Sequence, residues 1–226
     1  MFLMEIPSGL VRFLHSHRSG LLAFALVIQM VISPAADYHP RIGAVLAVVA
    51  GLLLLAAASF MADRKAVKLV VLPVAALWFV ARLAEAFGNP RHLDARVSPA
   101  AGLALSIVVL CVIFQRVDSV PQTSGATIAE AFIGYLVMGT AFAQLYWILN
   151  QVIPNAFNQV IPVYHISSLL YFSLITMTSV GYGGILPINP YIRMVAAFES
   201  VAGIFYNAVV VARLVSSYRR AEKAQE

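Results

Sequence analysis

The stretch that decides the fold is Thr178-Ser179-Val180-Gly181-Tyr182-Gly183, a short segment with two glycines that lies between two apolar runs. The run before it, Ile166 to Met177, has about 12 residues, too few for a helix to cross a hydrocarbon core of about 30 Å. The run after it, Tyr191 to Val215, is long enough to cross. We therefore expect Ile166 to Met177 to form a re-entrant helix, which enters the membrane and turns back.

The composition of the chain is that of a membrane protein. Of its 226 residues 61% are hydrophobic and 11% are charged, and the mean hydropathy is +0.86, far above that of an ordinary soluble domain. The net charge of +5 does not indicate a nucleic-acid partner, because the basic residues stand in short clusters between apolar runs. The single cysteine, Cys111, excludes an intrachain disulfide and a cysteine-based metal site.

Six apolar runs come close to the roughly 20 residues that a spanning helix needs. We expect an all-α membrane fold with six transmembrane helices plus the re-entrant pore helix. A signal peptide is the alternative for the first run, because Arg12 and Arg18 precede it and small residues follow it. The six expected spans are Gly20 to Ala36, Ile42 to Ala62, Val67 to Phe87, Ala100 to Phe114, Ile128 to Leu149 and Tyr191 to Val215.

The basic residues of the loops predict the orientation of the chain, because Arg and Lys concentrate in short cytoplasmic loops. If the N-terminus is cytoplasmic, ten of the 15 basic residues lie inside and four outside, while Arg82 falls within the third span. This count predicts a multi-pass protein of the inner (plasma) membrane with both termini in the cytoplasm. The ten are Arg12, Arg18, Arg64, Lys65, Lys68, Arg116, Arg213, Arg219, Arg220 and Lys223, and the four are Arg41, Arg91, Arg96 and Arg193.

The segment from Thr178 to Gly183 has the chemistry of a cation pathway. A potassium ion gives up its water shell only where oxygens replace that shell at similar energy, and rings of backbone carbonyls do this. Gly181 and Gly183 take positive φ at little cost, which lets successive carbonyls line one axis. The Thr178 side chain can tie the segment to the preceding helix, and the Ser179 hydroxyl can add a ligand at the innermost position. The expected K+ ligands are Ser179, Val180, Gly181 and Tyr182.

With this motif the chain resembles the potassium channel superfamily. Thr178 to Gly183 matches the filter motif T-x-V-G-Y-G, set between an outer helix, a pore helix and an inner helix as in small prokaryotic six-transmembrane members. The resemblance covers about Ile128 to Val215, and the four preceding runs carry no matching motif. It implies a tetrameric pore to which each subunit contributes one filter segment. It also implies a gating hinge at Gly203, where a glycine weakens the inner helix locally.

Three departures from the family pattern bear on selectivity. Gly184 follows the motif where the family usually has Asp, and Ser179 stands where it usually has Thr. Many members also place a carboxylate or an aromatic residue behind the filter, where this chain offers Ile175 and Phe172. Fewer hydrogen bonds behind the filter predict a segment that inactivates easily or admits sodium.

The inner helix carries two polar residues of interest. Glu199 lies four residues before Gly203, and a carboxylate inside a membrane must meet a donor or water. It either supports the filter by accepting from a hydroxyl of the pore helix or serves helix packing, and both interpretations stay open. Asn207 either keeps an ion in the cavity hydrated or bonds to a neighbouring subunit. The expected cavity-lining residues are Ile204, Asn207 and Val211.

Charged residues inside the first four spans are few. Arg82 and Glu85 are a candidate gating pair, because charges inside a membrane are usually functional, but a pair near a helix end is more often structural. Leu103 to Phe114 has no Arg at every third position. Strong voltage dependence needs several such charges, so we expect weak voltage dependence or none.

The predicted function is a potassium-selective channel subunit that conducts K+ passively through a homotetrameric pore in membrane lipid, without an Arg-rich voltage sensor. The alternatives are a weakly selective monovalent cation channel and a non-conducting membrane scaffold with a channel-like fold. We expect no cofactor, nucleic acid or enzymatic role, because the five histidines show no metal spacing and no Ser-His-Asp or HExxH arrangement appears. The expected parts are a cytoplasmic segment (1–19), a four-span peripheral module (20–117), a pore domain (126–216) and a short cytoplasmic tail (217–226).

Overall fold

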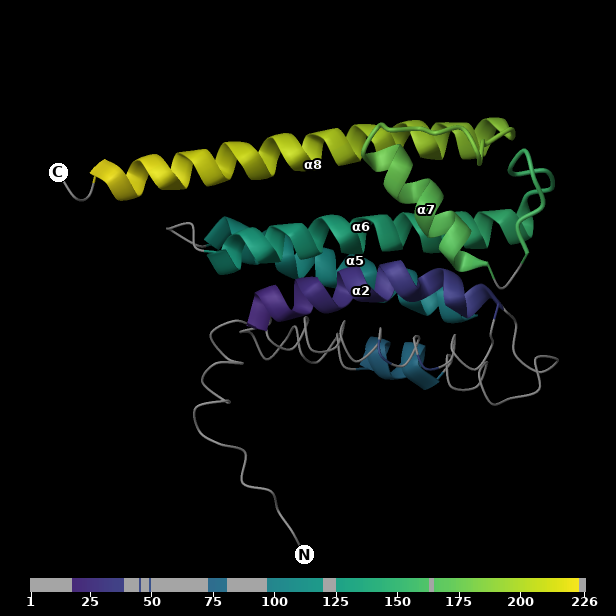
Figure 1. Ribbon diagram of the computed structural model, residues 1–226, viewed down its shortest axis with the longest axis horizontal. Coiled ribbons are helices and arrows are strands. Elements are labelled where there is room, and N and C mark those ends of the chain that lie inside the picture. The colour runs from purple at the N-terminus through teal and green to yellow at the C-terminus, as the bar shows by residue number, and fades with distance from the viewer. Residues whose placement is uncertain are drawn as a thin grey trace, which may run out of the picture.

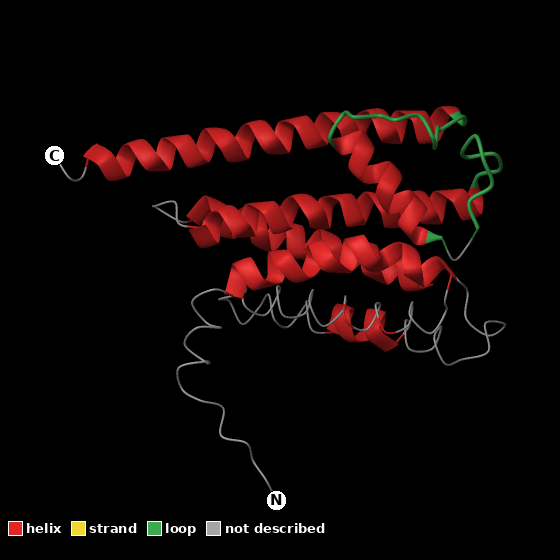
Figure 2. Ribbon diagram, viewed as in Figure 1, coloured by secondary structure: helices red, strands yellow, loops and turns green. Residues whose placement is uncertain are grey.

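The computed structural model describes residues 18–38, 45, 49, 73–80, 97–119, 125–162 and 165–223. These residues form helices joined by loops, as Figure 2 shows, with one isolated antiparallel bridge between Phe157 and Pro187. The cytoplasmic segment before residue 18, most of the second expected span and the pair Arg82 and Glu85 lie outside the described residues.

Among the described residues, five helices can be followed from end to end. One of them has the bounds that the sequence predicts, since α7 covers Ile166–Met177. The other four extend beyond their apolar runs. The last one continues through much of the expected tail. These four are α2 (Arg18–Tyr38), α5 (Val97–Ser119), α6 (Gly125–Val152) and α8 (Pro190–Lys223).

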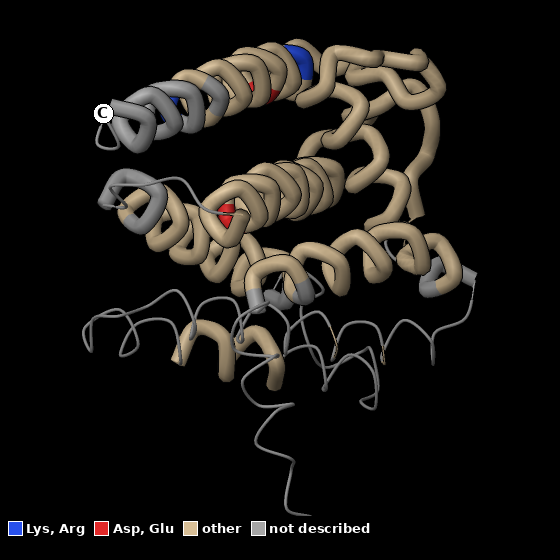
Figure 3. Tube along the Cα trace, turned by 60° about the vertical axis from the view of Figure 1, so that its left-hand side comes forward, with Lys and Arg blue, Asp and Glu red and all other residues tan. Residues whose placement is uncertain are grey.

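Two described stretches are long and apolar enough for a membrane crossing, namely Gly125–Val152 and Pro190–Val210. The apolar parts of α2 and α5 are shorter, Leu22–Ala35 and Pro99–Gln115. The helices carry few acidic or basic residues, as Figure 3 shows. Length and composition thus agree with a membrane location for α6 and the first part of α8.

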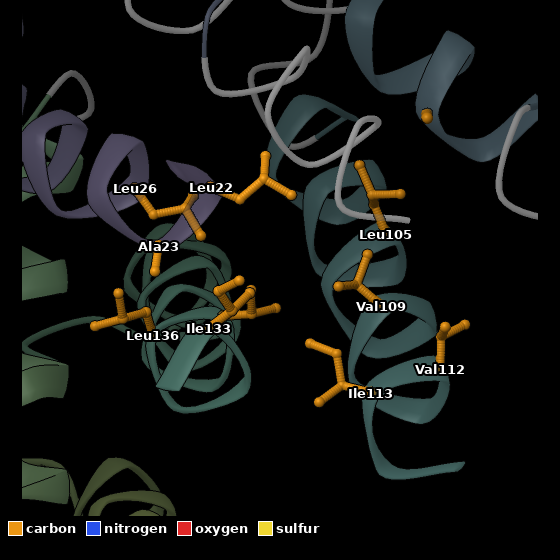
Figure 4. Close-up of a cluster of buried hydrophobic side chains, with 11 residues drawn as sticks. Leu22, Ala23, Leu26, Leu105, Val109, Val112, Ile113, Ile133 and Leu136 are labelled. Carbon is orange, nitrogen blue, oxygen red and sulfur yellow. The ribbon is translucent and has the colours of Figure 1, made fainter. Parts of the chain in front are cut away.

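The helices form layers around α6, which contacts all four others (Figure 1). On one side α2 and α5 lie along α6, and on the other side α7 slants between α6 and α8. Figure 4 shows the first side, where Leu22 and Leu26 of α2, Val109 of α5 and Ile133 of α6 belong to one cluster of buried side chains. Full burial of one such branched side chain is favourable by roughly 1.5–3 kcal/mol relative to its exposure to water.

A second core joins α6, α7 and the loop between them. The rings of Tyr146, Phe157 and Phe172 meet edge to face, with centroid distances of 5.0 Å between Tyr146 and Phe172 and 5.3 Å between Phe157 and Phe172. Edge-to-face contacts of this kind favour one mutual orientation of the rings. This core therefore fixes the slant of α7 and the place where its C-terminal end emerges.

The start of α8 follows from its sequence. The Asn189 side chain accepts a hydrogen bond from the Tyr191 amide at 3.0 Å, which is an N-terminal cap. Pro190 occupies the first helical position, where its missing N–H removes no helical hydrogen bond. The chain can thus pass from the glycine-containing segment into α8 within a few residues.

Candidate ion-conduction site

The end of α7 leads directly into the glycine-containing segment. The Thr178 amide and its hydroxyl both donate to the Leu174 carbonyl, at 3.0 and 2.7 Å. Beyond it every second residue has positive φ: 59° at Ser179, 53° at Gly181 and 80° at Gly183. The positive φ expected at the two glycines is confirmed.

Ser179 is the unexpected member of this alternation. For a residue with a Cβ, the left-handed conformation costs roughly 1–2 kcal/mol. Such strain persists only where the surroundings impose it, and it is frequent at functional sites. Nothing in the sequence indicated this conformation, because serine is compatible with many turn conformations.

The carbonyl groups at the start of the segment point the same way. The amide of Ser179 donates to the Thr176 carbonyl at 3.0 Å, and the amides of Val180 and Gly181 donate to the Ile175 carbonyl at 3.0 and 3.2 Å. In a trans peptide the carbonyl points opposite to the amide that follows it, and the described residues contain no cis peptide. The carbonyls of residues 178, 179 and 180 therefore all point away from α7, and their oxygens are available to a cation.

The whole segment from 178 to 184 lies on the surface of the single chain. The Val180 side chain is 51% exposed and that of Tyr182 is 75% exposed.

The residues after the segment are held by the loop between α6 and α7. The Asn158 side chain accepts from the Leu186 amide at 2.8 Å and donates to the Gly184 carbonyl at 3.4 Å. The Asn158 amide in turn donates to the Leu186 carbonyl at 2.9 Å. Sequence reasoning missed Asn158, because one asparagine in a polar loop carries no signal. It supplies a contact at Gly184, where the family's aspartate is absent.

Behind α7 the Glu199 carboxyl is fully buried, at 0% exposure. One of its oxygens accepts from the Tyr146 hydroxyl of α6 at 2.6 Å, and the other lies 2.5 Å from the Ser173 hydroxyl of α7. Ser173 also lies 2.8 Å from the Gly139 carbonyl of α6. Three helices thus meet at one carboxyl. The carboxyl reaches α7 from α8, at Ser173. The prediction of fewer hydrogen bonds behind residues 178–183 stays a prediction.

Gly203 lies against the end of α7. A Cβ built on Gly203 would stand 2.5 Å from the Met177 carbonyl oxygen and 3.0 Å from its Cα. One turn earlier the Ser200 hydroxyl donates to the Thr176 carbonyl at 3.3 Å. The structure therefore gives Gly203 a steric role, and its part as a gating hinge stays a prediction.

The expected cavity-lining residues lie beyond this contact. Ile204 is 58% exposed and Asn207 is also exposed, whereas the Val211 side chain is outside the described part. Lining of a cavity by these three residues stays a prediction. In the described ranges no group of three or more His, Cys, Asp or Glu side chains could hold a metal ion.

Residues 145–220 match the model of a protein family described as "Ion channel". No curated protein and no solved structure matches the chain. The matched stretch contains the end of α6, the loop with Asn158, α7, the glycine-containing segment and nearly all of α8. The match indicates a channel rather than an enzyme. Together with the two long apolar stretches, it supports an all-helical membrane protein that carries an ion-channel domain.

Proposed function

We propose that this protein is a potassium-selective channel subunit that conducts K+ passively. The observation that carries the proposal is the row of carbonyls of residues 178, 179 and 180, which point away from α7 at the end of an apolar helix. Carbonyl oxygens in such a row can replace the water shell of K+. Gly181 and Gly183 also have positive φ. We infer that the row of carbonyls continues through these residues toward Gly183.

The conducting form is a homotetramer in membrane lipid. One segment exposes its carbonyls together with Val180 and Tyr182, so it encloses an ion only when copies of it surround an axis. The exposed apolar side chains of α8 favour the same arrangement, because lipid or a neighbouring subunit can cover them. They include Met194, Phe198, Val201 and Phe205. The orientation with both termini in the cytoplasm belongs to this proposal.

Voltage has little effect on this channel. In α5 the only basic residue is Arg116, near the C-terminal end of the helix. Steep voltage dependence needs several charges that cross the membrane field. We expect a shallow conductance–voltage curve in planar bilayers, and a steep sigmoid would contradict this part of the proposal.

The test is ion flux through purified protein in liposomes, under an imposed gradient, with barium as blocker. We expect barium-sensitive flux for potassium and not for sodium. Equal flux for both ions would replace the proposal by a weakly selective cation channel. No flux for either ion, in protein shown to be folded, would favour a non-conducting scaffold.

Two glycine variants make this test specific to the segment. Gly181→Ala places a Cβ where φ is +53°, so we expect potassium flux to be lost. Gly184→Ala is the matched control, because Gly184 has no φ in the left-handed region and open space around it. Loss of flux in both variants, or in neither, would contradict the assignment of the pathway to this segment.

A further inference from the structure

The Glu199 carboxyl has an unusual environment for a charged group. Its two contacts are the hydroxyls of Tyr146 and Ser173, and in the described part of the chain it forms no ion pair. The nearest basic residue along α8, Arg193, lies six residues earlier and is exposed. An ionised carboxylate without a cation is costly in a low-dielectric interior.

The Ser173 hydroxyl lies within hydrogen-bond distance of two acceptors but carries one hydrogen. Its oxygen lies 2.5 Å from Glu199 Oε1 and 2.8 Å from the Gly139 carbonyl oxygen. Two oxygens approach this closely only with a hydrogen between them. A serine hydroxyl has one hydrogen, and a carbonyl has none to give. A protonated carboxyl supplies the second hydrogen, since the Tyr146 hydrogen is directed at Oε2.

We propose that Glu199 is protonated and neutral in the folded protein, and that it acts as a positioning residue for the pore helix. In this arrangement Tyr146 donates to Oε2, the carboxyl donates from Oε1 to Ser173, and Ser173 donates to the Gly139 carbonyl. The chain of hydrogen bonds starts and ends on α6 and passes through α8 and α7. The inference deepens the proposed function, because it assigns what holds α7 behind the carbonyl row.

Neutrality of Glu199 has a consequence for the ion path. A fixed negative charge behind α7 would attract cations of every kind, whereas a neutral carboxyl leaves ion binding to the carbonyls alone. Position, and not charge, is then what Glu199 contributes. A glutamine can reproduce this, because its amide nitrogen can donate to Ser173 and its oxygen can accept from Tyr146.

The first experiment is infrared spectroscopy of the full chain in liposomes at neutral pH. We expect the wild type to show a protonated carboxylic acid C=O band that shifts in D₂O and is absent from Glu199→Gln. Glu130→Gln is the matched control, because Glu130 is the other buried acid described, at 5% exposure, and we expect the Glu199 band to remain. A wild-type minus Glu199→Gln spectrum with carboxylate bands alone would overturn the proposal.

If Glu199→Gln does not fold, the Tyr146→Phe variant provides a second infrared test of the same carboxylic acid band. Loss of the donor to Oε2 should move the carboxylic acid band to higher wavenumber, and an unmoved band would overturn the assignment. The infrared result does not depend on conduction, so it stands apart from the flux test of the proposed function.

Flux tests the positioning role of Glu199 by conservative rescue. We expect Glu199→Gln to keep the wild-type ratio of potassium to sodium flux and Glu199→Ala to lose it. A Glu199→Ala variant that discriminates as well as the wild type would overturn the positioning role.

Discussion

The backbone of Gly203 in α8 lies directly against the carbonyl of Met177, the last residue of α7. No side chain separates the two helices here, and the Ser200 hydroxyl bonds to the carbonyl of the residue before Met177. A sideways movement of α8 at this level therefore disturbs the end of α7. The Glu199 carboxyl lies one turn before this contact, so the helices are joined by both a backbone contact and a hydrogen-bond chain.

Replacing Gly203 tests this contact. In Gly203→Ala the new Cβ meets backbone atoms that cannot rotate away, so we expect a loss of about 1–3 kcal/mol in the free energy of unfolding and a fall in potassium flux. Thermal unfolding followed by circular dichroism measures the first effect. Gly125→Ala is the control, because a Cβ at Gly125 meets nothing within 4 Å. Unchanged stability with altered open probability would favour a hinge role instead.

Removing the Tyr146 hydroxyl leaves a buried oxygen of Glu199 without its donor. We expect Tyr146→Phe to lower the free energy of unfolding by about 1–3 kcal/mol, while the ring contact with Phe172 remains. Tyr191→Phe, at a side chain that is 77% exposed, should leave stability unchanged. Equal stability of the two variants would mean that the Tyr146 hydrogen bond contributes nothing.

The Tyr206 side chain joins α8 to α6 and α5. Its hydroxyl donates to the Ala131 carbonyl at 2.6 Å and lies next to Gly134. The centroid of its ring lies 5.6 Å from that of Phe114. A Cβ at Gly134 would occupy the place of the hydroxyl, so Gly134→Ala and Tyr206→Phe should both release α8 from α6. Hydrogen exchange should become faster in the α8 amides around residue 206. Unchanged exchange in both variants would contradict this contact.

Asn158 determines how firmly the residues after the carbonyl row are held. Asn158→Ala removes the acceptor of the Leu186 amide and the donor to the Gly184 carbonyl, so we expect the ratio of potassium to sodium flux to fall. Asn158→Asp keeps the acceptor and should have a smaller effect. The exposed neighbour Gln159 provides the control variant Gln159→Ala. A wild-type flux ratio in Asn158→Ala would show that this loop does not influence selectivity.

The local features of α7 and of the glycine-containing segment could be predicted from the sequence, because they depend on residues close together in the chain. The bounds of α7 follow from a short apolar run, and the positive φ of Gly181 and Gly183 follows from their missing Cβ. The strained Ser179 could not be predicted, because serine is compatible with many turn conformations. The contacts of Asn158 could not be predicted, because its partners lie 26 and 28 residues away along the chain. The signal for Ser173 was weak, since one serine in an apolar helix is common.

The sequence by itself determined that this chain is rich in apolar helices and that one short run ends in a glycine-containing segment with the chemistry of a cation path. Only the tertiary structure decided which groups stand behind that segment. The Glu199 carboxyl is 26 residues from Ser173 and 53 from Tyr146 along the chain. The physical reason is that helix formation depends on neighbours within a few residues, whereas a buried polar network depends on how whole helices pack, which brings distant hydroxyls and one carboxyl within hydrogen-bond distance.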